Sequence, residues 1–384
     1  MNDAARRTIV ILSPEPWGKM MLSKMHYAME LVKKGHKVFF VNPPRQLKGK
    51  GLAVLAEERE GGDLVIIDTN IISGSLFLRH KLFFLYSLLN RRYIKAIKKI
   101  TGTDIYQVWS FNPNVYTDLR SFRSEKAILL LYDLYGGKHI WKAAGTADAL
   151  ISVSQVILDH YEKTPLPKLL VQHGLGRSFA DKALERRRQG AFEGPKEKKI
   201  RVGYTGNLLR EGMNTDIARD IIQRHPDIEF HFWGPSSLKD NNVNAANMEI
   251  KPDLAAFIGF LEQQKNVFLH GVVEQKELAE SLFEMDAFLF LYSPRKEVNG
   301  ASNAHKLLEY ISTGKTVVST FVSNYAGTGL LVMSDSENDL PAVFDTVIRD
   351  LPFYNSPERQ TERMDFALDN VYPRQVERIL NFVR

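Results

Sequence analysis

The sequence of 384 residues contains no cysteine. This absence excludes disulfide bonds and thiolate metal sites, and it fits a cytoplasmic protein without requiring that location. No apolar run approaches the roughly 18 residues that a membrane-spanning helix needs. Segment 1–12 carries Arg6 and Arg7 but lacks the long apolar stretch and the small-residue cleavage site of a secretory signal. We therefore expect a cytoplasmic chain.

Two kinds of ligand motif are also missing. No group of histidine, aspartate and glutamate has the spacing of metal ligands, so we expect a site without a metal ion. No Gly-x-Gly-x-x-Gly follows the first apolar run, which argues against a dinucleotide-binding domain and a bound cofactor. The net charge of +6 favours an anionic partner such as a nucleotide or a phospholipid head group. The basic run 186–188 lacks interleaved aromatic residues, so we expect no nucleic acid.

The chain does contain a repeated α/β pattern. Arg7–Leu12 is a short apolar run, a stretch with helical spacing then ends at Gly35, and Lys37–Val41 forms the next strand. This strand–helix–strand order predicts a parallel sheet. The order recurs with the strands Ile200–Tyr204 and Ile228–Trp233. Because the chain is long enough for two substantial cores, we expect two α/β domains.

The stretch 302–318 carries the most informative pattern. It predicts a helix that is capped at its start by Ser302 or Asn303 and ends at Gly314, followed by a short β-branched strand. The free N–H groups and the positive dipole end of such a helix start suit a phosphate. Lys306 lies one turn in, with Glu309 on the same face. A cation and a carboxylate would then flank a diphosphate and its ribose.

Two other interpretations of this stretch exist. Lys306 and Glu309 could form a solvated ion pair at i and i+3, the usual arrangement on a helix surface. The run 313–316, Thr-Gly-Lys-Thr, also invites a P-loop interpretation. That interpretation fails because the first motif position would be Glu309 instead of glycine, and because the helix precedes the strand. We favour the nucleotide site over both.

The segment Asn303–Val318 resembles the signature of nucleotide-sugar glycosyltransferases with the GT-B fold, especially glycosyltransferase family 4. That pattern runs Ser-Pro-x-Lys-x-x-Glu-Tyr, a small residue, Gly-Lys and Pro-Val-Val. The resemblance implies two Rossmann-like parallel-sheet domains that face each other across a cleft. It also implies that Glu309 binds the donor ribose and that the sugar keeps its anomeric configuration. The sequence departs from the pattern at Ala304, where the family has proline, and at Ala301, where it has a first glutamate.

Further site residues follow from this resemblance and from local chemistry. Gly206 allows a close backbone approach to a phosphate, and Arg210 could pair with it; the alternative is a tight turn with a surface arginine. Asp133 matches a residue near the acceptor and the reacting sugar, with capping of the next helix or turn as the alternative. The predicted catalytic residues are Asp133, Glu297, Lys306 and Arg210. The predicted nucleotide-binding residues are Gly206, Asn207, Arg210, Gly234, His270, Gly271, Ser302, Asn303, Lys306, Leu307 and Glu309.

Domain boundaries follow from composition. We expect an acceptor-side domain over 1–176 that ends near the His-Gly-Leu-Gly turn, and a charged linker over 177–199. A nucleotide-sugar domain would occupy 200–355. Helices would fill 356–384, and the resemblance implies that the last of them crosses back to the N-terminal domain.

The segment Leu82–Lys99 combines an apolar face with many basic residues. Such a helix can dock on an anionic membrane surface, or it can pack on a sheet with its basic face in water. Both interpretations stay open.

Taken with the resemblance, these patterns predict a metal-independent glycosyltransferase that uses a UDP- or GDP-sugar donor. The acceptor would be a glycan or a lipid-linked glycan in surface polysaccharide synthesis, with the protein peripheral at the inner face of the membrane. Two alternatives remain: a sugar-nucleotide epimerase of the same fold, and a catalytically silent binding module.

Overall fold

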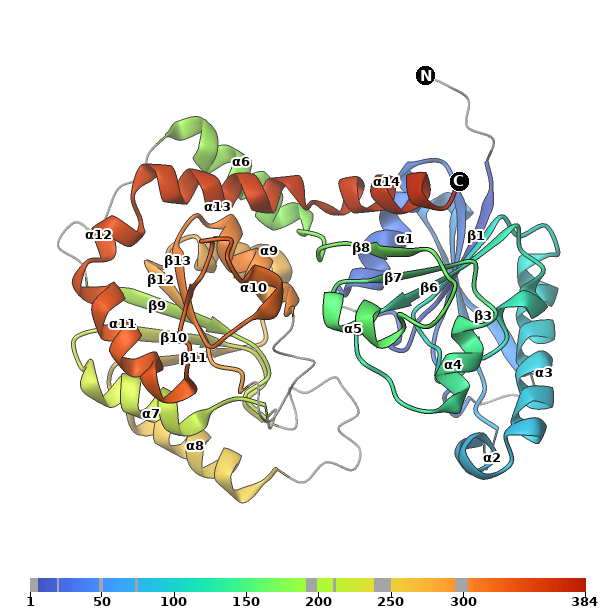
Figure 1. The fold of residues 1–384 in the computed structure, drawn as a ribbon, viewed down its shortest axis with the longest axis horizontal. Helices are drawn as coiled ribbons and strands as arrows, with labels where there is room; N and C mark the ends of the chain where they lie inside the picture. The colour runs from blue at the N-terminus through green and yellow to red at the C-terminus, as the bar shows by residue number, and fades with distance from the viewer. Residues whose placement is uncertain are drawn as a thin grey trace. The chain divides into compact units, whose positions relative to one another are not determined.

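The computed structural model describes residues 6–18, 21–47, 51–72, 75–190, 199–209, 212–237, 250–293 and 303–384. The chain divides into two compact units (Figure 1). Unit 1 comprises Met1–Gln172 and Tyr372–Arg384, and unit 2 comprises His173–Val371. Each unit is an α/β layer structure built on one sheet. No helix in the described part of the chain is long and apolar enough to cross a bilayer.

Unit 1 contains an eight-stranded sheet in the order β3-β4-β2-β1-β5-β6-β7-β8. Pairing is parallel except at the edge, where β3 runs antiparallel to β4. The predicted parallel sheet is therefore confirmed, and it has this one antiparallel strand. The strand bounds are β1 Thr8–Leu12, β2 Lys37–Val41, β3 Ala53–Arg59, β4 Leu64–Thr69, β5 Gln107–Ser110, β6 Lys126–Leu131, β7 Ala149–Ser152 and β8 Lys168–Leu170.

Helices cover both faces of this sheet. On one face the strands pack against Tyr93 and Ile97 of α3, and on the other against Tyr27 and Leu31 of α1 and Val376 of α14. The buried strands read as continuous apolar runs because both of their faces lie in a core. The helix bounds are α1 Ser23–Lys33, α2 Ser75–Lys81, α3 Phe83–Thr101, α4 Lys138–Ala144, α5 Gln155–His160 and α14 Tyr372–Phe382.

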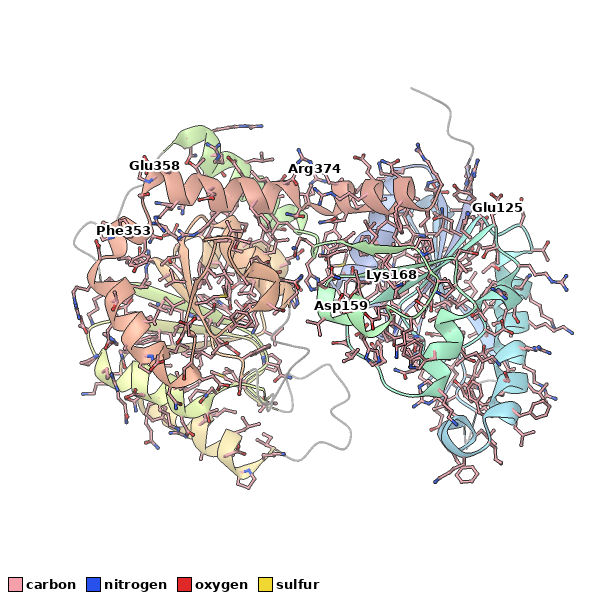
Figure 2. All side chains as sticks on the ribbon, viewed as in Figure 1. Glu125, Asp159, Lys168, Phe353, Glu358 and Arg374 are labelled. Carbon is pink, nitrogen blue, oxygen red and sulfur yellow. The ribbon has the colours of Figure 1, made fainter. Side chains whose placement is uncertain are left out.

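The last helix, α14, belongs to unit 1 and packs on α1. Its apolar side buries Val376 and Ile379, while Arg374 is exposed on the helix surface (Figure 2). At its first turn the ring of Tyr372 stacks on His26 of α1, with centroids 4.4 Å apart and an interplanar angle of 13°. Burial, with a smaller contribution from Lys33, lowers the pKa of His26 to about 4.

The lowered pKa of His26 predicts an acid-sensitive fold. The folded state disfavours imidazolium, so His26 contributes stability above its unfolded pKa of 6.5 and loses it as pH falls toward 4. A difference of this size corresponds to roughly 3 kcal/mol at most. Chemical denaturation between pH 7 and pH 4 should show this loss, and His26→Phe, which keeps the ring stack, should reduce it. An equal loss in both proteins would show that other groups titrate.

Unit 2 contains a six-stranded parallel sheet in the order β11-β10-β9-β12-β13-β14. The strand bounds are β9 Arg201–Thr205, β10 Glu229–Trp233, β11 Val267–Gly271, β12 Ala287–Phe290, β13 Thr316–Ser319 and β14 Val332–Met333. The helix bounds are α6 Arg177–Gln189, α7 Thr215–Arg224, α8 Pro252–Gln263, α9 Gln275–Leu282, α10 His305–Ser312, α11 Leu340–Arg349, α12 Leu351–Tyr354 and α13 Pro357–Asp369. Helices α7, α8 and α11 share one apolar core with the sheet, and α6, α9 and α10 share the other.

The prediction of a charged linker over 177–199 is wrong for most of its length. Residues Arg177–Gln189 form helix α6, which lies beside α13 (Figure 1). Phe179, Ala180 and Ala183 are buried in the core of unit 2, and Arg187 pairs with Asp365 at 2.8 Å. The high charge density concealed this short apolar stripe, whose spacing is helical. Residues 191–198 lie outside the described part of the chain.

Candidate nucleotide site

The candidate site lies at the carboxyl ends of the unit 2 strands. Strand β9 is the switch point of the sheet, because the chain continues to β10 on one side and reaches β12 on the other. Ligands of open α/β sheets bind outside the carboxyl ends of the strands at such a point. Pairing of β9 with β10 extends to Thr205, but its pairing with β12 ends at Gly203. Strands β9 and β12 therefore separate just before the predicted phosphate loop, which begins at Gly206.

Three predicted glycines meet at this edge. Gly206 follows β9 with φ +148°, Gly234 follows β10 with φ +130°, and Gly271 ends β11 with φ +67°. The Gly206 N–H donates to the Trp233 carbonyl at 2.8 Å, and the Gly234 N–H donates to the Gly271 carbonyl at 2.7 Å. A Cβ on Gly234 would lie 2.1 Å from the Gly206 carbonyl oxygen. The space that a side chain would need is taken by the Gly206 backbone at Gly234 and by Lys306 at Gly206, so glycine at these two positions lets the segments pack closely.

Asn207 continues the loop after Gly206. Its side-chain oxygen accepts a hydrogen bond from the Leu209 N–H at 2.9 Å, and the Leu208 N–H donates to the Pro235 carbonyl at 3.0 Å. The asparagine side chain thus stabilises a turn that mimics a backbone turn. It shapes the loop, whereas the prediction gave it only a binding role.

Helix α10 begins differently from the prediction. Its N-cap is Ala304, which has no capping side chain, so capping by Asn303 is wrong in the described structure. Asn303 is buried instead, and its backbone carbonyl accepts a hydrogen bond from His173 Nε2 at 3.0 Å. Ser302, the other predicted cap, lies outside the described residues. Leu307 is fully buried in the core of unit 2, where its side chain packs with other apolar residues.

Lys306 is buried, with 4% of its surface exposed. Its Nζ donates to the Thr205 carbonyl at 2.6 Å and lies over the rings of Tyr204 and Tyr292, at 4.6 and 4.2 Å from their centroids. A Cβ on Gly206 would lie 2.5 Å from this Nζ. The alternative of a solvated surface pair is therefore wrong for Lys306. Its ammonium group therefore lies next to Gly206, on the side where a β-carbon of that residue would point.

Glu309 is partly buried, one helical turn after Lys306. Burial raises the pKa of its carboxyl to about 7, and the nearby Lys306 opposes this shift. The carboxyl group is therefore close to its midpoint at neutral pH. A ligand that donates hydroxyl hydrogens to it would favour the ionised form.

His270 lies on the sheet surface just before Gly271. Its ring stacks on Trp233 at 4.6 Å, and its Nε2 lies 2.9 Å from Nδ1 of His231. Burial lowers the pKa of both histidines, that of His231 to about 4. Sequence reasoning missed Trp233 and His231 as its partners, although their alternation along β10 places both on one face.

Asp133 lies in unit 1, exposed in the loop after β6. The helix part of its alternative role is wrong, because the N-cap of α4 is Gly137 and no side chain caps it. Tyr135 donates to the Asp133 carboxylate at 3.4 Å; burial raises the pKa of this tyrosine, with contributions from Asp133 and Glu15. Glu15 in turn pairs with the buried Lys24 at 2.7 Å. Sequence reasoning missed Glu15, although it follows the carboxyl end of β1.

Three predicted residues, Arg210, Glu297 and Ser302, lie outside the described residues. Among the described residues, no group of three or more histidine, aspartate or glutamate side chains is arranged to hold a metal ion.

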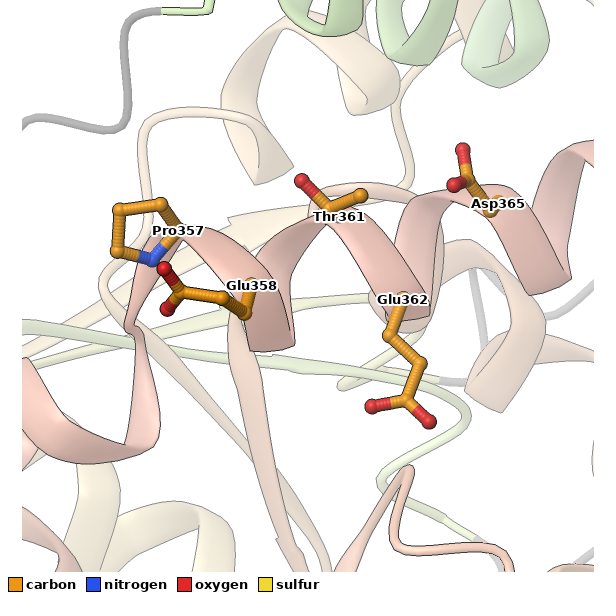
Figure 3. A pocket seen from close by; sticks show the side chains of 5 residues that line it. All are labelled: Pro357, Glu358, Thr361, Glu362 and Asp365. Carbon is orange, nitrogen blue, oxygen red and sulfur yellow. The ribbon is translucent and has the colours of Figure 1, made fainter.

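A surface hollow occurs on α13 and is lined by side chains of that helix, three of which are acidic (Figure 3). None of the predicted site residues lines it. Its lining residues are Pro357, Glu358, Thr361, Glu362 and Asp365.

Comparison with known proteins gives a match at the level of structure. No protein-family model and no curated protein sequence matches the chain. Sucrose-phosphate synthase from Thermosynechococcus elongatus matches with a TM-score of 0.68 and 12% identity, covering 98% of each chain. An Escherichia coli trehalose-6-phosphate protein bound with UDP-2-fluoro glucose gives 0.69 and 10%, with 98% of each chain covered. Anabaena HepE in complex with UDP and glucose gives 0.62 and 12%, covering 98% of this chain and 100% of that one.

These similarities extend over nearly the whole chain at low identity, so they establish its architecture. Together with the two parallel-sheet units they confirm the predicted fold class. The chain has the GT-B fold of nucleotide-sugar glycosyltransferases.

Proposed function

We propose that the chain is a glycosyltransferase that moves a sugar from a nucleotide-diphosphate sugar to a hydroxylated acceptor. One observation carries this proposal: the tightly packed glycine loop after β9, where the buried ammonium of Lys306 lies next to Gly206 and the carboxyl of Glu309 follows one helical turn further on. Cleavage of the glycosidic bond builds negative charge on the leaving diphosphate. Oriented amides and a desolvated cation stabilise such charge without needing to reorganise during the reaction.

Each residue has a role in this proposal. Gly206 and Gly234 shape the loop that receives the diphosphate, Lys306 supplies positive charge, and Glu309 accepts hydrogen bonds from the ribose hydroxyls. Arg210 and Glu297 would contact the phosphate and the sugar, and Asp133 would act on the acceptor side. We propose UDP as the nucleotide, since two structurally similar proteins are described with UDP or a UDP-sugar. Retention of configuration and independence from metal belong to the same proposal.

Release of UDP from UDP-sugars tests this function. We expect release that depends on an added sugar acceptor, is unaffected by EDTA, and falls strongly in Lys306→Met. Conversion of the donor without any acceptor would identify an epimerase instead. Absence of turnover with UDP- and GDP-sugars in the presence of glycan acceptors would favour the silent binding module.

The acceptor, in this proposal, is a glycan or lipid-linked glycan at an anionic membrane. The supporting feature is the α2–α3 surface of unit 1. Segment 75–102 contains no aspartate or glutamate. Its Lys81, Arg92 and Lys95 are exposed beside a row of exposed apolar side chains. These are Phe77 (60% exposed), Leu82 (46%), Phe84 (75%), Leu85 (45%) and Leu88 (44%).

The two earlier interpretations of Leu82–Lys99 both describe part of this surface. One side of α3 packs on the sheet through Tyr86, Tyr93 and Ile97. The other side presents apolar side chains next to cations, and the helix is broken at Leu82 so that α2 adds Phe77. On an anionic membrane the apolar side chains would insert below the head groups, and the basic side chains would bind the head-group phosphates.

Liposome co-sedimentation tests the membrane part. We expect binding to vesicles of phosphatidylglycerol and phosphatidylcholine but weak binding to pure phosphatidylcholine. Phe84→Ser combined with Leu88→Ser should reduce binding about tenfold or more, because two apolar side chains that would insert into the membrane are lost. Phe353→Ser, at a residue 51% exposed in unit 2, is the matched control and should bind normally. Equal loss in the control, or no binding to the anionic vesicles, would contradict the proposal.

A further inference from the structure

Thr205, the last residue of β9, pairs with β10 on one side and is held by helix α10, instead of by strand β12, on the other. Beyond Gly203 strand β12 no longer pairs with β9. Tyr310 takes the place of the strand: its hydroxyl oxygen accepts from the Thr205 N–H at 2.6 Å and lies 2.9 Å from Thr205 Oγ1. Lys306, one turn earlier on the same helix face, donates to the Thr205 carbonyl at 2.6 Å. Two side chains of α10 therefore complete the hydrogen bonding of this strand end.

This contact fixes a particular peptide plane. The Thr205 carbonyl and the Gly206 N–H belong to the same planar peptide group. The carbonyl is held by Lys306, and the N–H donates to the Trp233 carbonyl at 2.8 Å. Because both ends of the plane are held, the chain direction into the glycine loop is set by α10 on one side and by β10 on the other.

The contacts of Tyr310 and Lys306 with Thr205 are rigid because all three residues are buried. Tyr310 is fully buried, and its ring lies flat on Phe288 with centroids 4.5 Å apart and an interplanar angle of 7°. Thr205 is 6% exposed and Lys306 is 4% exposed. A buried hydroxyl with good partners holds its geometry strongly, since breaking these bonds would leave polar groups unpaired.

One amide of the loop is available to a ligand. The Gly206 N–H donates to Trp233, the Leu208 N–H to Pro235 and the Leu209 N–H to the Asn207 side chain. The N–H of Asn207 donates to no residue that the structure describes. It follows directly after the glycine at the switch point, where a phosphate oxygen is expected to approach.

We propose that the Asn207 amide is the phosphate contact of this loop, and that Tyr310 is a positioning residue that aims it through Thr205 and Gly206. The ligand is the diphosphate of a nucleotide, so this inference rests on the proposed function. Lys306 then acts on the phosphate through the loop that it holds and through its charge, rather than as a direct hydrogen-bond partner.

Tyr310→Phe tests the proposal because it removes the hydroxyl and keeps the ring that stacks on Phe288. Isothermal titration with UDP and with uridine separates the phosphate-dependent part of the affinity from the rest. We expect the UDP affinity to fall about tenfold or more, and the uridine affinity to change less than about twofold. Tyr325→Phe, at a tyrosine equally buried in unit 2, controls for the general cost of removing a buried hydroxyl and should bind both ligands normally.

Three outcomes decide between the possibilities. Unchanged UDP affinity in Tyr310→Phe, or equal weakening of UDP and uridine, would overturn the positioning role. Wild-type protein that binds neither UDP nor GDP would overturn the proposed function itself. Protein labelled with ¹⁵N-asparagine adds a test that needs no variant of Tyr310. The Asn207 amide signal, assigned with Asn207→Ser, should shift with UDP and not with uridine, and its failure to shift with UDP would contradict the phosphate contact.

Discussion

Replacing Gly234 by alanine is expected to abolish nucleotide binding. The new Cβ would lie 2.1 Å from the carbonyl oxygen and 2.7 Å from the carbonyl carbon of Gly206, and backbone atoms cannot move aside as a flexible side chain can. Gly234 also has φ +130°, a conformation that alanine adopts only with strain. Strand end and loop must therefore separate, which displaces the loop that receives the diphosphate. We expect the UDP affinity to fall at least about 100-fold, or about 2.7 kcal/mol, together with a lower melting temperature.

The matched control is the same substitution at Gly259. This glycine lies inside helix α8, and a Cβ there would meet no atom within 4 Å. Alanine favours a helix interior over glycine by roughly 0.5–1 kcal/mol, so this variant should be slightly more stable and should bind UDP normally. Titration calorimetry and thermal melting of both variants check the pair. Normal binding by the Gly234 variant would show that the glycine edge is not the ligand site.

The second large effect is a dependence of nucleotide affinity on pH. Burial raises the pKa of Glu309 to about 7, and ribose hydroxyls donate best to the ionised carboxylate. Below pH 7 the free protein holds a proton that binding must release. The affinity for UDP should therefore fall by about tenfold for each pH unit below 7, reaching roughly 100-fold at pH 5, and should level off above pH 8.

Glu309→Gln separates this titration from that of the UDP phosphate, which titrates in the same range. The variant should bind more weakly at pH 8 and should show only the shallow pH dependence that belongs to the ligand. The free protein offers a second check. Its folded state holds the Glu309 proton more tightly than the unfolded chain, so Glu309 costs stability progressively as pH rises from about 4.5 to about 7. The variant should lack this cost. An identical pH profile of UDP binding in both proteins would contradict the assignment of Glu309.

Local sequence signals were sufficient to place much of the candidate site. Gly206 and Gly234 could be predicted because a glycine directly after a parallel strand marks a turn at the ligand-binding edge. Lys306 and Glu309 could be predicted because their spacing places them on one helix face. The two strand–helix–strand units were readable for the same reason, since each lies within a short window of sequence.

Other features depend on contacts between distant segments. Tyr310 holds Thr205, which lies 105 positions earlier, and no local pattern announces that partnership. Helix α6 was concealed because its few apolar residues lie among many charges. The break at Leu82 was equally hidden, since the apolar and basic residues continue through it. In each case tertiary packing, which short windows do not record, decides the structure.

The most direct test of the central claim is a thermal-shift comparison of UDP, GDP, ADP, CMP and NAD, each with and without EDTA. A ligand at a hundred times its Kd stabilises the folded state by about 2.7 kcal/mol, enough to shift the melting temperature measurably. We predict that one diphosphate nucleotide raises the melting temperature, that EDTA does not change this, and that Gly234→Ala abolishes it. Absence of a shift with all five ligands, or a shift that survives in Gly234→Ala, would contradict a nucleotide site at the carboxyl ends of β9 and β10.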